Sequence, residues 1–176
     1  MNKAAPQPTS AHAFIALGAN LPSGTGSPID TLHRILPELA RLSQQALIVS
    51  SFYGSDPKDC PPDSPEYVNA VVALMPLPDD DPFTLLEKLQ RLEQAHGRER
   101  SGLRNEARTL DLDLLGFGTV CCTTPLLILP HPRAHQRRFV LEPWQEIAGA
   151  NWPLAGKTLS EWLQENRDPP LRTLTS

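Results

Sequence analysis

The stretch that decides the fold is Leu110-Asp111-Leu112-Asp113-Leu114, in which leucine and aspartate alternate without a break. Successive side chains of a β-strand point to opposite faces of a sheet, so this alternation predicts a strand that buries its leucines on one face. Asp111 and Asp113 then lie together on the other face, roughly 6.5–7 Å apart. Two carboxylates at this spacing, with no cysteine or histidine between them, favour magnesium as a bound ion.

The sequence before this strand predicts three more strands and two helices. Short apolar or β-branched runs, bounded by turn residues, indicate strands at 13–17, 47–53 and 67–75. Apolar residues that recur every three or four positions indicate helices at 29–42 and 82–96. The resulting order, strand-helix-strand-strand-helix-strand, is that of a ferredoxin-like split βαβ core with a mostly antiparallel sheet.

The sequence after this strand contains two short helix candidates, 139–148 and 159–164, which can cover the remaining face of the sheet. The fold class is therefore predicted to be α+β, a three-layer α-β-α sandwich. Polar and proline-containing ends predict a flexible leader at 1–11 and a flexible tail at 167–176. A single domain, 12–166, is expected between them.

The composition excludes several classes of protein. Hydrophobic residues make up 40% of the chain and charged residues 20%, which is typical of a globular domain rather than a disordered one. A formal charge of −4 argues against a general nucleic-acid binder. There is neither the apolar core of a signal peptide nor a membrane-spanning run. Three cysteines without metal-ligand spacing favour reduced thiols, and a cytoplasmic, monomeric protein is expected.

Four arginines lie in the polar segment just before the aspartate strand, at positions 98, 100, 104 and 108. An isolated Asp-x-Asp pair usually decorates a solvated face, and a single arginine is usually surface charge. Together, magnesium ligands and guanidinium groups are typical of phosphoryl transfer, because both neutralise phosphate oxygens. The chain lacks a Walker-type glycine-rich loop, so side chains and other loops must hold any nucleotide.

The order of several motifs resembles one known family, the 6-hydroxymethyl-7,8-dihydropterin pyrophosphokinases of folate biosynthesis, from residue 13 to about 163. The motifs are Ala16-Leu17-Gly18-Ala19-Asn20-Leu21, Ser50-Ser51-Phe52-Tyr53, Tyr67-Val68-Asn69-Ala70, Glu93 with Gly97-Arg98-Glu99-Arg100, Arg108-Thr109-Leu110-Asp111-Leu112-Asp113, and His131-Pro132-Arg133 followed by Phe139. Their combination and order are far more specific than any one of them.

The resemblance implies transfer of pyrophosphate from ATP to 6-hydroxymethyl-7,8-dihydropterin, with release of AMP. It further implies that Asp111 and Asp113 hold two Mg²⁺ ions, and that Arg98 and Arg108 act at the transferred phosphates. For ATP binding it points to Gln90, Glu93, Arg100, His131 and Arg137. For pterin binding it points to Ser55, Tyr67, Asn69 and Phe139, of which Phe139 stacks on the ring and Asn69 reads its amide edge.

The chain departs from the family pattern in two loops. Asn105-Glu106-Ala107 stands where the family usually has Trp-Gly-Pro, and Asp56-Pro57-Lys58-Asp59 adds charge to the pterin-side loop. These changes leave open a catalytically weak paralogue that serves as a pterin- or nucleotide-binding module. Another magnesium-dependent phosphotransferase or hydrolase on the same fold is a third reading, because a fold alone never fixes function.

Overall fold

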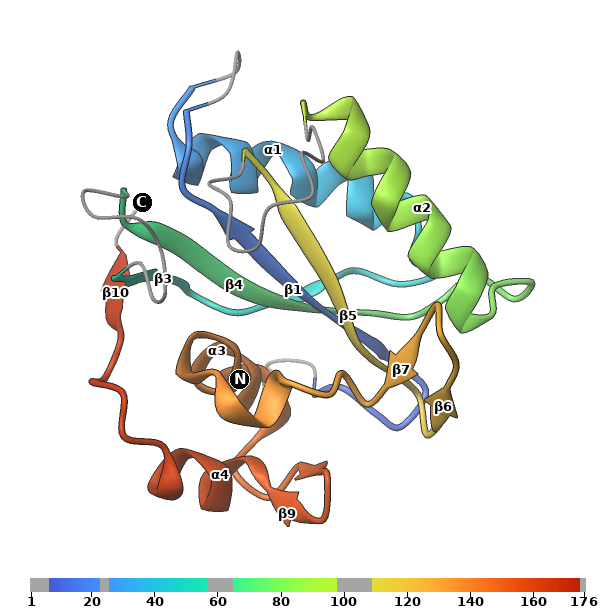
Figure 1. The fold of residues 1–176 in the computed structure, drawn as a ribbon. Helices are drawn as coiled ribbons and strands as arrows, with labels where there is room; N and C mark the ends of the chain where they lie inside the picture. The colour runs from blue at the N-terminus through green and yellow to red at the C-terminus, as the bar shows by residue number, and fades with distance from the viewer. Residues whose placement is uncertain (1–6, 23–25, 57–64, 98–108, 175–176) are drawn as a thin grey trace, which may run out of the picture.

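The computed structural model describes residues 7–22, 26–56, 65–97 and 109–174 (Figure 1). The core elements are β1 (Ala13–Ala19), α1 (Pro28–Ala40), β2 (Ile48–Val49), β3 (Phe52–Ser55), β4 (Tyr67–Leu74), α2 (Pro82–Ala95) and β5 (Asp111–Phe117). They are followed by β6 (Cys122–Thr123), β7 (Ile128–Leu129), the 3-10 helix η1 (Ala134–Gln136), α3 (Arg138–Ala148), β8 (Pro153–Leu154), β9 (Lys157–Thr158), α4 (Leu159–Glu165) and β10 (Arg172–Leu174).

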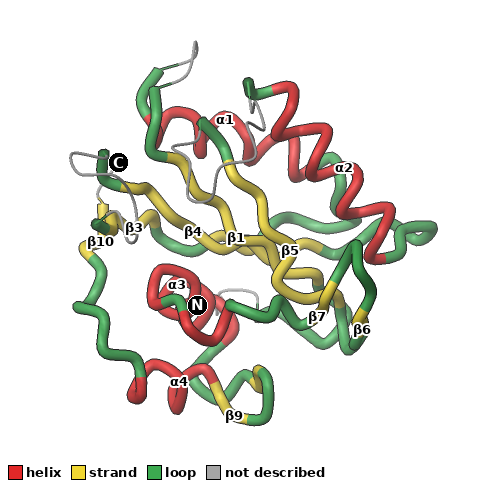
Figure 2. Tube along the Cα trace, in the orientation of Figure 1, coloured by secondary structure: helices red, strands yellow, loops and turns green. Residues whose placement is uncertain are grey.

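The main sheet has the strand order β10-β3-β4-β1-β5, with β2 as a further partner of β4, and each of these pairings is antiparallel. Helices α1 and α2 cover one face, while α3 and α4 lie on the other side (Figures 1 and 2). The predicted split βαβ core and three-layer sandwich are confirmed. Among the described residues, no helix has the length and apolar character needed to cross a bilayer.

Each sheet face carries its own apolar core, because alternate residues of the central strands point in opposite directions. On β4, Val68, Ala70, Val72 and Leu74 pack toward α1 and α2. The intervening residues Val71 and Ala73 join Phe14, Trp144 and other apolar side chains under α3. The central strands are thus buried on both faces, and polar residues on them stand out as exceptions.

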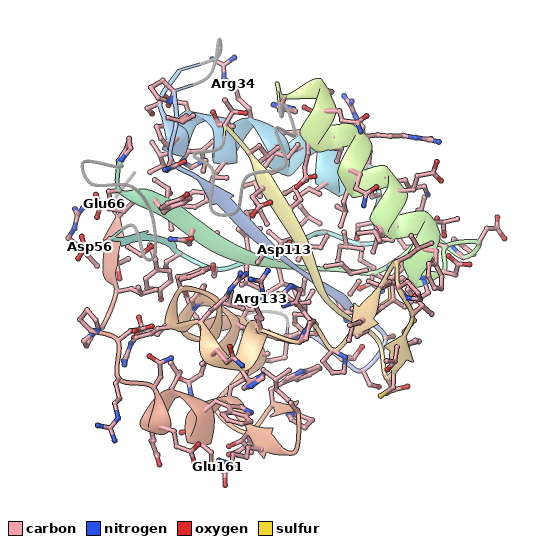
Figure 3. All side chains as sticks on the ribbon, in the orientation of Figure 1. Arg34, Asp56, Glu66, Asp113, Arg133 and Glu161 are labelled. Atoms are coloured by element: carbon pink, nitrogen blue, oxygen red, sulfur yellow. The ribbon has the colours of Figure 1, made fainter. Side chains whose placement is uncertain are left out.

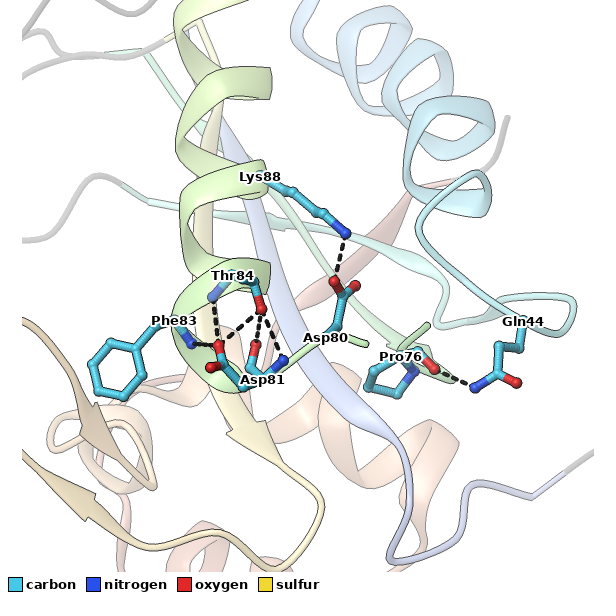
Figure 4. Close-up of polar contacts among 7 residues, drawn as sticks. All are labelled: Gln44, Pro76, Asp80, Asp81, Phe83, Thr84 and Lys88. Carbon is cyan, nitrogen blue, oxygen red and sulfur yellow. Dashed lines mark hydrogen bonds and ion pairs between the residues drawn. The ribbon is translucent and has the colours of Figure 1, made fainter. Parts of the chain in front are cut away.

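Side-chain caps mark the start of α1, α2 and α4. In α2, the Asp81 carboxylate accepts hydrogen bonds from the backbone N–H groups of Phe83 and Thr84, and the Thr84 hydroxyl accepts from the Asp81 N–H (Figure 4). These bonds satisfy N–H groups that have no partner within the helix and lower the pKa of Asp81. Lys88 of α2 also forms an ion pair with Asp80, just before the helix, and this contact helps to fix the start of α2.

One prediction of local structure is wrong. The expected strand 47–53 is divided into β2 and β3, because Ser50 bonds to the backbone of Val71 while the Ser51 N–H donates to the Glu146 carboxylate. In the segment expected to be a flexible tail, residues 172–174 form β10, which pairs with β3. Of the three cysteines, Cys121 and Cys122 are free thiols, and Cys60 lies outside the described residues.

Tyr53 offers a direct test of this packing. Its hydroxyl donates to Glu146, and burial together with that carboxylate raises the pKa of Tyr53 to about 12. The neutral phenol is favoured in the folded chain, so its stabilising contribution is present below pH 10 and is lost as pH rises through about 12. The chain has only two tyrosines. Absorbance titration should show a late ionisation step that is absent from Tyr53→Phe; an unchanged titration curve in that variant would contradict the assignment.

Candidate active site

A row of residues crosses the sheet on the face toward α3. Gly18 of β1 pairs with Asn69 of β4 on one side and with Asp111 of β5 on the other. Residues directly opposite one another in antiparallel strands point to the same face. A Cβ atom at Gly18 would lie 3.8 Å from Oδ1 of Asn69 and 3.9 Å from Cβ of Asp111. Because Gly18 has no side chain, it leaves open space between the buried Asn69 amide and the Asp111 carboxylate. We call the backbone of β1 at this place the floor of the site.

Ala16, two residues before Gly18, continues this floor. It pairs with Asp113 on β5 and with Val71 on β4. Asp111 and Asp113 thus lie beside two small residues of β1, Gly18 and Ala16. The register confirms that both aspartates lie on one face of the strand, as predicted. Two carboxylates with room above them suit Mg²⁺, which takes one or two protein carboxylates and fills its remaining positions with water and phosphate oxygens.

Cationic side chains gather opposite Asp113. Nη1 of Arg137, just before α3, lies 3.4 Å from Oδ2 of Asp113. Burial lowers the pKa of His131, while the Asp113 carboxylate opposes that shift and the charges of Arg137 and Arg133 add to it. Figure 3 labels Asp113 on β5 and Arg133 near the start of α3. Arg133 was missed as a candidate, although it belongs to the quoted His-Pro-Arg motif.

A pocket of about 290 Å³ opens beside Asp113. Its walls come from α2, β5 and the β6–β7 hairpin, and they bring together Gln90, Glu93 and His131, three of the predicted ATP-binding residues. The apolar part of the lining was not predicted; it consists of Leu86, Leu112, Leu114, Leu126, Leu127 and Ile128. Leu126 is 81% exposed, which is unusual for leucine and marks the rim of the pocket.

Glu93 has a second role besides lining this pocket. Its side chain is only 2% exposed, and Oε1 accepts a hydrogen bond of 2.7 Å from the backbone N–H of Leu112. Leu112 lies between Asp111 and Asp113, on the strand at this end of the sheet. A buried carboxylate that accepts a strand N–H fixes both groups, because leaving either without a partner would cost about 1–3 kcal/mol. Glu93 thereby anchors the strand that carries the aspartates.

The predicted pterin residues lie at the other end of the row. Asn69 is 4% exposed, and its Nδ2 donates to Oγ of Ser55 at 2.9 Å. Ser55 and Tyr67 are direct partners between β3 and β4. Phe139, in the first turn of α3, packs partly buried against the core under that helix. The guanidinium of Arg137 stands 5.5 Å from the centre of its ring.

Several predicted residues lie outside the described part of the chain. They are Arg98, Arg100 and Arg108, together with the variant segment 105–107 and residues 57–59 of the pterin-side loop. Within the described residues, no group of three or more carboxylate, histidine or cysteine side chains forms a complete metal cage. Among the described residues, the candidate metal site therefore consists of the two carboxylates of Asp111 and Asp113.

Comparison with known proteins identifies the family that this chain matches. Residues 14–149 match the model described as 7,8-dihydro-6-hydroxymethylpterin-pyrophosphokinase. The 2-amino-4-hydroxy-6-hydroxymethyldihydropteridine pyrophosphokinase of Haemophilus influenzae is 42% identical over 137 residues, covering 77% of this chain and 81% of that protein. The protein of the same name from Pseudomonas aeruginosa is 40% identical over 138 residues, covering 77% and 79%.

Among solved structures, the crystal structure of Plasmodium falciparum HPPK-DHPS wild type with pteroate resembles this chain with a TM-score of 0.65. The likeness covers 88% of this chain and 44% of that one, at 11% sequence identity. At this identity the comparison supports the fold alone.

Proposed function

Because this chain belongs to the 7,8-dihydro-6-hydroxymethylpterin-pyrophosphokinase family, we propose a division of labour among its residues for transferring pyrophosphate from ATP to 6-hydroxymethyl-7,8-dihydropterin. In this reaction the pterin hydroxyl oxygen bonds to the β-phosphorus of ATP, the bond from that phosphorus to the α–β bridging oxygen breaks, and AMP leaves. The hydroxyl proton passes to water. The single observation that carries the proposal is the row Asn69-Gly18-Asp111, which sets the pterin residues directly beside the metal residues.

Asp111 and Asp113 would hold two Mg²⁺ ions against the phosphates of ATP. When bound, magnesium supplies charge neutralisation for the leaving and transferred phosphates. Arg137 and His131 stand close to Asp113, where they can donate to phosphate oxygens. Arg133 adds a third donor to this group. The family resemblance gives Arg98, Arg100 and Arg108 parallel roles.

The base of ATP is assigned to the apolar pocket between α2 and the β6–β7 hairpin. Leu86 and Ile128 provide flat apolar contact, and Gln90 provides an amide for the polar edge of the ring. Asp113 and His131 line the same pocket. A nucleotide with its base in the pocket therefore directs its phosphates toward the aspartates.

The pterin is assigned to the space between Phe139 and the Asn69 end of the floor. A flat heteroaromatic ring can stack on Phe139 while its edge bonds to the Asn69 amide. The bond from Asn69 to Ser55 restrains that amide before the ligand arrives, which lowers the entropy lost on binding. Tyr67 completes this wall from the start of β4.

Phe139→Ala should weaken pterin binding roughly tenfold or more and change ATP binding by less than about threefold, because ring stacking is worth about 1–3 kcal/mol. Calorimetric titration of each ligand measures both constants. Phe83→Ala removes a phenylalanine that is 41% exposed on α2 and should leave pterin affinity unchanged. Equal weakening of both ligands by Phe139→Ala would refute the stacking role.

The overall proposal is tested by measuring AMP formation from ATP and magnesium, with and without 6-hydroxymethyl-7,8-dihydropterin. Pterin-dependent AMP release is the expected result. A folded chain that binds pterin yet releases no AMP would be the binding module considered above. We also propose a monomer working in the cytoplasm, with residues 12–166 as its single catalytic domain. Gel filtration tests the oligomeric state, and a dimer would contradict this part of the proposal.

A further inference from the structure

The residues that follow α4 form an extended segment, 166–174, which we term the C-terminal strap. It leaves the end of α4, passes the start of α3 and finishes as β10 at the edge of the main sheet (Figures 1 and 2). The family match ends at residue 149, so the strap lies beyond the part of the chain that the family model describes. None of its residues belongs to the proposed metal, nucleotide or pterin sites.

Three hydrogen bonds tie the strap to the start of α3. Nη1 of Arg138 donates to the carbonyl of Asp168 at 3.0 Å, and the N–H of Leu171 donates to Oε2 of Glu142 at 3.0 Å. The side chain of Asn166 donates to the carbonyl of Gln136 at 3.2 Å. Arg138 and Glu142 also pair with each other one helical turn apart, and both side chains are largely buried. The first turn of α3 is therefore held by the strap on its outer side.

The other end of the strap pairs with the main sheet next to Ser55. Arg172, Thr173 and Leu174 pair with Gly54, Tyr53 and Phe52 in that order. Nη2 of Arg172 lies 2.7 Å from both carboxylate oxygens of Glu66, the residue just before β4, and Figure 3 shows Glu66 beside β10. Through β10 and Arg172, the strap thus contacts β3, which carries Ser55, and the residue before β4, which carries Tyr67 and Asn69.

Gly54 is what allows this contact. A Cβ atom there would lie 2.5 Å from Oε1 of Glu66 and 3.3 Å from Nη2 of Arg172, so any larger residue would force the ion pair away. The ion pair crosses directly over the glycine backbone. The glycine at position 54 of β3 therefore leaves room for the ion pair between Arg172 and Glu66.

The strap connects α3 to the main sheet at a place where the side chains of α3 and β3 do not fill the space between them. A hollow of about 670 Å³ lies between β3, α3 and α4, lined by Tyr53, Arg138, Glu146 and their neighbours. Glu146, near the end of α3, spans it by accepting from Ser51 and Tyr53 of the sheet. At the beginning of α3, where Phe139 stands, the strap supplies the corresponding connection through Arg138 and Glu142.

We propose that the C-terminal strap is a positioning element for the acceptor substrate: it fixes the first turn of α3, with Phe139, relative to the strand ends that carry Ser55 and Asn69. This inference rests on the proposed pterin site. A pocket whose two walls are held apart at the correct distance loses less conformational entropy when a ring enters it. The nucleotide pocket lies between α2 and the β6–β7 hairpin, and none of its lining residues belongs to the strap.

Two kinds of variant test the strap. A chain that ends after Glu165 lacks the whole strap. The variant Arg172→Ala removes only the ion pair with Glu66. The shortened chain should bind pterin about tenfold more weakly, and Arg172→Ala about twofold to fivefold, since exposed ion pairs contribute little individually. The dissociation constant for ATP with magnesium should change by less than about twofold in both. The exchanged pair, Arg172→Glu with Glu66→Arg, should recover affinity lost in Arg172→Ala.

Arg91→Ala is the matched control, because Arg91 and Glu87 form an ion pair of similar exposure on α2. It should change neither constant. Wild-type pterin affinity in the shortened chain, or equal losses for pterin and ATP, would overturn the inference. Failure of the exchanged pair to recover affinity would do the same for the Arg172 contact, even if the shortened chain does not fold.

Amide hydrogen exchange separates this inference from the proposed function. Loss of the strap should accelerate exchange at the first turn of α3 and along β3, with no ligand present. If the wild-type chain binds no pterin, the proposed function fails. If instead exchange in these segments is unaffected by removal of the strap, the strap is not a positioning element, whatever the chain binds.

Discussion

Asp111→Ala should lower the rate of pterin-dependent AMP formation by at least about a thousandfold while the chain stays folded. The loss follows because the charge neutralisation that a bound metal supplies is worth several kcal/mol, and each 1.36 kcal/mol is about a factor of ten in rate. The fold should survive, since β5 keeps its pairing with β1 and its anchor at Glu93. Rates measured over a range of magnesium concentrations test both points, together with thermal unfolding.

Asp113→Ala should reduce the rate to a similar degree and also release Arg137, which loses its partner at 3.4 Å. Asp79→Ala is the control, because that aspartate is exposed on the approach to α2 and lies outside the pocket lining. It should leave the rate unchanged. If Asp111→Ala retained near-normal turnover at ordinary magnesium concentration, the metal site would have to be sought elsewhere.

Gly18→Leu should weaken pterin binding by about a hundredfold, which corresponds to about 2.7 kcal/mol. A Cβ atom at this position meets its neighbours at 3.8 and 3.9 Å, which is ordinary van der Waals contact. The remaining atoms of the leucine must then enter the space above the floor, between Asn69 and Asp111. The substrate should be excluded by volume, while the strand keeps its hydrogen bonds.

The matched control for this variant is Gly116→Leu. Gly116 is a strand glycine on β5 at which an added Cβ meets nothing within 4 Å. Both variants should unfold near the wild-type temperature, and only Gly18→Leu should lose pterin affinity in a fluorescence titration. Unchanged affinity in Gly18→Leu would mean that the pterin does not lie over the floor, and the assignment of Asn69 would fall with it.

The fold was largely predictable because its signals are local. Alternation in 110–114 reports which face each aspartate occupies, and the same period assigns Asn69 to the face opposite Val68. The adjacency of Asn69, Gly18 and Asp111 was beyond reach. It depends on the register of three strands that lie far apart in sequence, and register follows from how whole faces pack.

The features that were not predicted also have physical causes. The hydrogen bond from the N–H of Leu112 to the Glu93 carboxylate was not predicted, because nothing local in either segment indicates it. The tail was expected to be flexible because it is polar and contains Pro169 and Pro170. A strand forms there because β3 leaves an open edge within reach, and that edge is a property of the assembled sheet rather than of the tail.

The anchoring of β5 by Glu93 bears on the solubility of the chain. In the sheet built from the described residues, β5 is an outer strand, and an outer strand with free N–H groups can pair with a strand of another molecule and start aggregation. Glu93 occupies the N–H of Leu112, and Asp111 and Asp113 place like charges along the strand. The carboxylates proposed to bind magnesium are therefore also expected to discourage self-association.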